Sequence, residues 1–410
     1  MTKKDAAAAE FQAMWREYED RVERSYELIR AKIKDASLAS RLEQFCDAHD
    51  GFMTYEEYLQ LEQFGRDGYH EKHDNHGATS GREKWAEQLI HLCKNQKFEQ
   101  VVEFGFGDGA LGLKTLELAQ KEGMKKIRWC GVEANADLIE KAKRKFTELG
   151  FMVKRFFRPT QVELVESISR VPHRKKTLVV FQYSLDSVPP QLFTSTSKGS
   201  SSIDTMLGLT VKDGILQEIH VSDAQLKARG ISFQNGVYTD AGGNTFDLSS
   251  WETIMLGQRA YVAIGAFSAL ANMAKRVGEG SSFLVIDEFQ RIRKLPHLEN
   301  GHLCLPKSLT DGGTDIEQEL AYEEAGNKLF YYPTYLPTMI SVLEGLGFNC
   351  GRRGVIEEKF AEELVGRTWT ETRTGPGTHL SLAVLAENMK RKPRKNGVSV
   401  TMPRGITNYS

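Results

Sequence analysis

The stretch Val101-Val-Glu-Phe-Gly-Phe-Gly-Asp-Gly109 decides the fold of this chain. An apolar run ends here in three glycines spaced G-x-G-x-G, and a helical pattern begins near Ala110. This sequence is typical of a buried strand that turns through a glycine loop into a helix. Glycines let the backbone turn tightly and let a ligand approach the main-chain N–H groups. The stretch therefore predicts a ligand site after the first strand of an α/β sheet.

The segments after this loop repeat the strand and helix rhythm of a parallel sheet covered on both faces. Helical patterns separate the first three apolar runs, and the fifth run comes about a hundred residues after the fourth. We therefore expect an α/β fold with a Rossmann-like sheet, a helical N-terminal extension and a large insertion between strands 4 and 5. The predicted strands are residues 101–104, 127–132, 152–157, 178–181 and 282–286, followed by a last strand at 380–385.

Outside the core, apolar residues recur at three- and four-residue steps over about 6–49, which predicts an amphipathic helix or helical pair. Such an extension packs on the core or joins two copies of the chain as a homodimer. The insertion is rich in Ser, Thr, Gly and Asp, and short apolar stretches over 203–237 suggest a small β subdomain. A basic tail is expected to be flexible. The expected segments are 1–92 (helical extension and cofactor-covering loop), 93–190 (first part of the core), 191–257 (inserted substrate or lid subdomain), 258–389 (second part of the core) and 390–410 (tail).

Bulk composition excludes several partners. Lys and Arg number 54 against 55 Asp and Glu, so the net charge of -1 gives no field that favours nucleic acid or anionic lipid. No apolar run approaches the ~20 residues that cross a bilayer. The five cysteines lack CxxC or metal-ligand spacing, which favours a reduced cytoplasm. His70, His73 and His76 lie close together, but the glycines around them indicate a loop, so we expect no metal.

Two acidic residues distinguish between cofactors. The spacing G-x-G-x-G departs from the G-x-G-x-x-G of dinucleotide sites. Glu103 precedes the first glycine by two positions, where it would attract a cationic amino acid end and repel a pyrophosphate. Glu133 ends the second strand, where a carboxylate can accept both ribose hydroxyls of an adenosine. These features favour S-adenosyl-L-methionine (SAM) over NAD. The predicted contacts are Glu103, Gly105, Gly107, Asp108, Gly109 and Glu133.

Several segments also match one family in the right order. Gly68-Tyr69 with Gly77-Ala-Thr-Ser80, Val180-Phe-Gln-Tyr-Ser-Leu-Asp-Ser-Val-Pro189 and Phe283-Leu-Val-Ile-Asp-Glu-Phe289 resemble motifs of the MidA-like methyltransferases. That family includes the mitochondrial complex I assembly factor that methylates arginine in a protein. The resemblance covers about 53–385 and implies a class I methyltransferase sheet and SAM as cofactor. It also implies a loop that closes over the cofactor through Thr79 and Ser80.

The chain departs from the family where substrate specificity is expected. Gln182 and Tyr183 replace the Asn-Glu of the fourth-strand motif, and Glu288-Phe289 replaces a Tyr-Gly. The resemblance alone therefore does not imply an arginine substrate, whereas the cofactor residues lie elsewhere.

The end of the fourth strand carries the catalytic candidates Gln182, Tyr183 and Asp186. Ligands of open α/β sheets lie outside the carboxyl ends of the strands, so these residues should face the transferring methyl group. Asp186 could take a proton or hold a cationic amine, and Tyr183 could aim its hydroxyl or ring face at the sulfonium. In the alternative, Asp186 caps the turn before Pro189 and Tyr183 only packs.

We therefore expect methyl transfer from SAM to a protein side chain, arginine included, or to a small-molecule N or O nucleophile. The alternative is a SAM-binding assembly or interaction factor with little or no turnover. A nicotinamide oxidoreductase would need the dinucleotide spacing that this chain lacks.

Overall fold

A computed structural model describes most of the chain. The described residues are 12, 28, 30–33, 36–63, 82–124, 126–151, 162–173, 176–182, 184–185, 188, 190–197, 202–249, 259–290, 297–299, 302–304, 334–355, 379–387 and 399–401.

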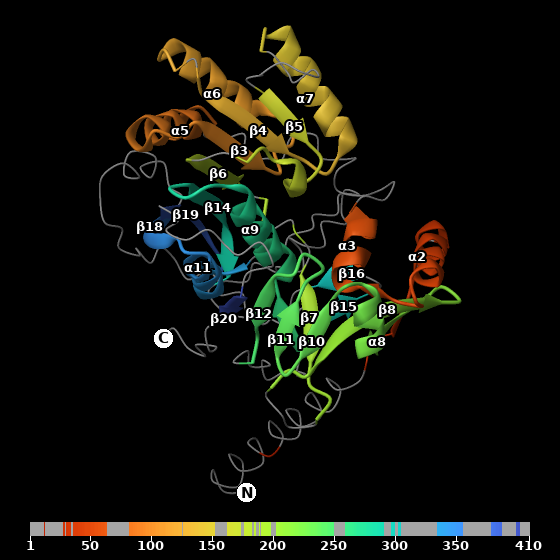
Figure 1. The fold of residues 1–410 in the computed structure, drawn as a ribbon. Helices are drawn as coiled ribbons and strands as arrows, with labels where there is room; N and C mark the ends of the chain where they lie inside the picture. The colour runs from red at the N-terminus through yellow and green to blue at the C-terminus, as the bar shows by residue number, and fades with distance from the viewer. Residues whose placement is uncertain are drawn as a thin grey trace, which may run out of the picture.

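An eight-stranded sheet forms the core of the fold, in the upper half of Figure 1. Its strands are β3 (Gln100–Phe104), β4 (Arg128–Val132), β5 (Val162–Val165), β6 (Thr177–Gln182), β14 (Ser282–Gln290), β17 (Thr334–Tyr335), β18 (Asn349–Val355) and β19 (His379–Glu387). The strand order is β18-β19-β14-β6-β3-β4-β5, with β17 paired to β14. β5, β4, β3, β6 and β14 run parallel, and β19 runs antiparallel to β14 and β18. The strand order reverses between β3 and β6, which is the topological switch point.

Helices cover both faces of this parallel sheet. They are α5 (Arg82–Gln96), α6 (Ala110–Lys121), α7 (Ala136–Glu148), α9 (Ile264–Arg276) and α11 (Leu336–Gly345). Alternate residues of β6 point to opposite faces. Leu178 and Val180 join a buried cluster with α5, α6 and α7, whereas Val179 and Phe181 join a second cluster with α9 and α11. This two-sided burial explains why the strands read as continuous apolar runs.

The predicted α/β class is confirmed, and so are five of the six predicted strands, the last of them as β19. Residues 152–157, the predicted third strand, lie outside the described residues. The strand that pairs with β4 is β5, which begins at Val162.

A second, antiparallel sheet joins three distant parts of the chain, and we call it the composite sheet. Its strands are β1 (Arg30–Lys32), β2 (Met53–Thr54), β7 (Gln191–Thr194), β8 (Thr205–Lys212), β9 (Ile215–His220) and β13 (Arg259–Val262). The order is β1-β9-β8-β7-β13, and β2 pairs with β8. The N-terminal extension therefore contributes strands to the sheet of the insertion, and β13 returns the chain from this sheet to the core.

The helix or helical pair predicted over residues 6–49 is present at Ala36–Ala48, but the prediction is wrong for Arg30–Lys32. Arg30–Lys32 forms β1, which pairs with Ile215–Gln217 of β9, and the following helix is α2 (Ala36–Ala48). Three residues are too few to show a period, so the sequence could not separate a strand from the helical pattern around it. The helix α3 (Tyr55–Gln63) follows β2 directly.

The rest of the insertion forms a second small sheet. The segment 203–237, for which a small β subdomain was predicted, is divided between the composite sheet, which takes β8 and β9, and this second sheet. Its helix is α8 (Asp223–Ala228), and its strands are β10 (Ser232–Gln234), β11 (Val237–Thr239) and β12 (Thr245–Asp247). The sheet order is β10-β11-β12-β20, where β20 is Ser399–Thr401. This part of the predicted flexible tail is therefore a strand, because β12 offers it a parallel edge. The remaining elements are the turn η1 (Ile168–Arg170) and a hairpin of β15 (His297–Glu299) and β16 (His302–Cys304).

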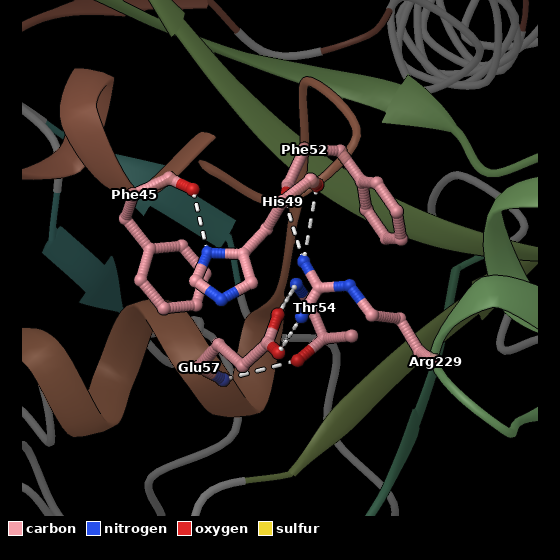
Figure 2. Close-up of polar contacts among 6 residues, drawn as sticks. All are labelled: Phe45, His49, Phe52, Thr54, Glu57 and Arg229. Carbon is pink, nitrogen blue, oxygen red and sulfur yellow. Dashed lines mark hydrogen bonds and ion pairs between the residues drawn. The ribbon is translucent and has the colours of Figure 1, made fainter. Parts of the chain in front are cut away.

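One arginine joins the extension to the insertion (Figure 2). Arg229, which follows α8, forms an ion pair with Glu57 of α3 and donates to the carbonyl oxygens of His49 (3.2 Å) and Phe52 (3.0 Å). Its guanidinium carbon lies 5.1 Å from the ring centre of Phe52 and 5.7 Å from that of Phe45. A planar guanidinium can make these polar and ring contacts together.

Across the described ranges, the model contains no helix long and apolar enough to span a membrane.

Candidate functional site

The predicted cofactor residues meet at one edge of the parallel sheet. Phe104, the last residue of β3, pairs with Val132 at the end of β4 and with Phe181 near the end of β6. The loops that leave these three parallel strands therefore begin side by side. This is the edge and the switch point where open α/β sheets bind their ligands.

The glycine loop follows β3. Gly105, Gly107 and Gly109 have φ angles of +67°, +55° and +74°, a region that side chains other than glycine adopt at a cost. The loop then runs into α6 without a side-chain cap from Gly109. Because Gly109 has no side chain, the N–H groups at this helix start need other partners.

The three glycines have different surroundings. A Cβ at Gly105 would lie 2.8 Å from Cβ of Ser184, and one at Gly109 would lie 2.9 Å from the ring of Phe146. Both glycines are therefore required by packing against the protein itself. A Cβ at Gly107 would meet no described atom within 4 Å, so Gly107 is the glycine that faces open space. Of the three, only Gly107 fits the expected role of leaving room for a ligand.

Glu133 holds the middle of this loop from the neighbouring strand. Its carboxylate accepts a hydrogen bond from the N–H of Gly107 at 3.1 Å and another from the N–H of Asn135 at 3.0 Å. The side chain is buried, and this desolvation raises the pKa of Glu133, while the N–H bonds oppose the rise. Each carboxylate oxygen has a second acceptor position, so Glu133 retains capacity for ligand hydroxyls.

Asp108 stabilises the start of α6. One carboxylate oxygen accepts from the N–H of Ala110 at 3.1 Å, and the other pairs with the Lys145 ammonium of α7 at 2.9 Å. These contacts join α6 to α7 beside the loop. Asp108 is therefore a residue that shapes the loop in this structure.

Glu103 and Gln182 lie on the same face of the sheet. Glu103 is buried and stands opposite Val180, two residues before Gln182 on β6. Side chains alternate along a strand, so Glu103, Val180 and Gln182 share the face covered by α5, α6 and α7. Both polar residues lie at the carboxyl ends of their strands.

Beyond β6 the chain presents a further polar residue, which the sequence argument did not select. The Oγ of Ser184 and the Nε2 of Gln182 are buried, and neither has a hydrogen-bond partner among the residues that the structure describes. Asp287 of β14 is also buried and accepts from the N–H of Leu185 at 3.0 Å, which fixes the backbone after β6. Asp287 lies in one of the family-like motifs, and this was the only signal for it in the sequence.

The remaining predicted residues lie outside the described ranges. These are the catalytic candidates Tyr183 and Asp186 and the covering-loop residues Thr79 and Ser80. The three clustered histidines also lie there. Within the described residues, no group of three His, Cys, Asp or Glu side chains is placed to hold a metal.

Comparisons with known proteins agree with this architecture. No family model and no curated protein matches the chain. A COG1565 superfamily member from Burkholderia thailandensis, solved with S-adenosyl-homocysteine bound, aligns with a TM-score of 0.51 at 12% identity over 92% of this chain and 96% of that chain. An uncharacterised protein of the same superfamily and organism aligns over the same shares with a TM-score of 0.50, also at 12% identity. The chain therefore has the class I SAM-dependent methyltransferase fold.

Proposed function

We propose that this protein is a SAM-dependent methyltransferase. One arrangement carries the proposal: a glycine loop at the switch point of a class I sheet, with Gly107 facing open space and Glu133 bonded to its N–H. A carboxylate at this place, beside free space, suits an adenosine ribose.

The described residues fit such a cofactor. The glycine loop leaves space for it at Gly107, and Glu133 retains acceptor positions for the ribose hydroxyls. Glu103 supplies a negative charge for an ammonium group. When bound, SAM supplies an electrophilic methyl group on its sulfonium. The protein's task is then to align the nucleophile and to exclude water.

The acceptor is proposed to be a protein side chain or a small molecule with a nitrogen or oxygen nucleophile. Tyr183 and Asp186 follow β6 in sequence, and we propose that they contact this acceptor. The MidA-like resemblance raises arginine as one protein acceptor, but the Gln182-Tyr183 pair removes the carboxylate that would pair with a guanidinium. The four buried cysteines of the described chain are free thiols, which is compatible with a cytoplasmic enzyme.

Binding and turnover test the proposal separately. Titration calorimetry should detect SAM and S-adenosylhomocysteine and should give no heat with NAD. Methyl-labelled SAM, incubated with protein and small-molecule pools, should then transfer label, and Asp186→Asn or Tyr183→Phe should slow transfer far more than it weakens SAM binding. Binding of NAD in place of SAM would refute the proposal.

A second function has its own supporting observation. Gln182 and Tyr183 replace the polar pair of the family motif, as expected for a SAM-binding assembly factor that has lost turnover. SAM binding without label transfer to either pool would favour this alternative.

A further inference from the structure

Two polar side chains at the end of β6 make no hydrogen bond through a buried donor to any residue that the structure describes. Ser184 Oγ and Gln182 Nε2 are buried without a described hydrogen-bond partner, and a buried donor without a partner is destabilising. Both belong to a segment that is fixed in place. Ser184 lies against Gly105, and the next N–H donates to Asp287 at 3.0 Å. Two such donors, two residues apart at the carboxyl end of β6, fit a ligand group that accepts hydrogen bonds.

Their position along the sheet edge indicates which part of the ligand they face. Glu133 lies at the tip of β4, the glycine loop follows β3, and Ser184 follows β6. Neighbouring strands are about 4.8 Å apart, so the Glu133 side and the Ser184 side are separated by roughly 10 Å. A cofactor whose ribose lies at Glu133 would reach β6 with its opposite end. In SAM that end is the amino acid.

The chemistry of the three β3 and β6 side chains matches a zwitterion. An amino acid end carries an ammonium, which needs an anionic acceptor, and a carboxylate, which needs donors. Glu103 supplies the anionic acceptor for the ammonium, and it shares a sheet face with Gln182. We propose that the hydroxyl of Ser184 and the side-chain amide of Gln182 donate to the carboxylate of the methionine moiety, beside Glu103. This inference rests on the proposed SAM-binding function and adds Ser184 as a residue that selects the amino acid end.

The test compares two ligands on matched variants by titration calorimetry. S-adenosylhomocysteine has the amino acid end, whereas 5'-methylthioadenosine shares the adenosine and thioether and lacks it. Ser184→Ala should weaken S-adenosylhomocysteine about 10- to 100-fold, the range for a hydrogen bond to a charged group, and leave methylthioadenosine unchanged. Ser268→Ala is the control, because the Ser268 hydroxyl on α9 is also buried without a described partner. It should change neither affinity.

A second variant keeps the size of the side chain and changes its charge. Gln182→Glu replaces a donor by a carboxylate, so it should weaken S-adenosylhomocysteine at least as much as Ser184→Ala and spare methylthioadenosine. Thermal melting of each variant checks that it is folded.

The outcomes separate the two proposals. If Ser184→Ala and Gln182→Glu leave S-adenosylhomocysteine unchanged, or weaken both ligands equally, the carboxylate assignment is overturned while SAM binding stands. If the wild type binds neither ligand, the proposed function itself fails, and the inference fails with it.

Discussion

The parallel sheet and the composite sheet contrast in how the chain builds them. Four of the parallel core strands, β3 to β6, follow one another in sequence, β14 comes after the insertion, and the registers of β3, β4 and β6 align the loops that carry Glu133 and the three glycines. The composite sheet instead takes strands from residues 30–54, 191–220 and 259–262. Local sequence pattern therefore predicts the strands of the first sheet, whereas the second pairs segments far apart in sequence, which no local pattern reports.

The largest effect should come from breaking the long-range contacts. Arg229→Ala would remove an ion pair to Glu57, two bonds to carbonyl oxygens and two ring contacts, and Arg229 is only 14% exposed. We expect the free energy of unfolding of the composite sheet region to fall by about 2–4 kcal/mol, as for a mostly buried charge whose partner is left unpaired. Denaturant titration with far-UV circular dichroism measures this.

Its control is Arg170→Ala. The Arg170 and Glu166 side chains pair at 2.9 Å but are 64% and 62% exposed. The free energy of unfolding should therefore fall by less than about 1 kcal/mol. Equal losses for the two variants would show that Arg229 does not hold the extension to the insertion.

Within the core, Gly105 and Gly107 should separate folding from binding. Gly105→Ala meets Ser184 at 2.8 Å and has a φ of +67°, so it should destabilise the protein by about 2–3 kcal/mol. Gly107→Ala pays only the strain of a positive φ, about 1 kcal/mol, but places a methyl group in the open space and should weaken SAM more than tenfold. Melting temperatures and calorimetry distinguish the two. If Gly107→Ala still binds SAM strongly, the open space at Gly107 is not part of the cofactor site.

The pKa of Glu133 predicts how cofactor binding depends on pH. In the proposed site, ribose hydroxyls would donate to the ionised carboxylate of Glu133, and burial raises the pKa of this carboxylate above the ordinary 4.5. Affinity for S-adenosylhomocysteine should therefore fall on acidification, and the fall should begin at a higher pH than for an ordinary glutamate. Glu133→Gln should bind about tenfold more weakly at neutral pH and lose this dependence. A wild-type affinity that stays constant down to the ordinary pKa would contradict the ribose role.

The smallest effect concerns Glu56 of α3, beside the insertion. Burial, then the charges of Glu57 and Asp240, raise the pKa of Glu56 to about 7. A carboxyl whose pKa is raised in the folded state contributes stability that is complete below its unfolded pKa and is lost as the pH rises through about 7. Glu56→Gln should therefore melt at a temperature that varies less between about pH 5 and 8. Identical pH profiles for variant and wild type would place Glu56 in a more solvated setting.

The sequence by itself determined the core and its cofactor edge. Continuous apolar runs predicted β3, β4, β6 and β14, because strands buried on both faces have few polar positions. The positions of Glu103 and Glu133 relative to the glycines also followed from sequence alone, since carboxyl ends of neighbouring parallel strands meet at one edge.

Only the tertiary structure decided what the individual residues contact. Gly105 and Gly109 differ from Gly107 because Ser184 and Phe146 come from distant segments, and no local pattern reports such contacts. The strand β1 and the tail strand β20 are too short to show a period and form because β9 and β12 offer them edges. Ser184 gains its significance in the same way, from burial beside the glycine loop. The periodicity of the sequence indicates which residues are buried. Only the three-dimensional packing decides which other residues they contact.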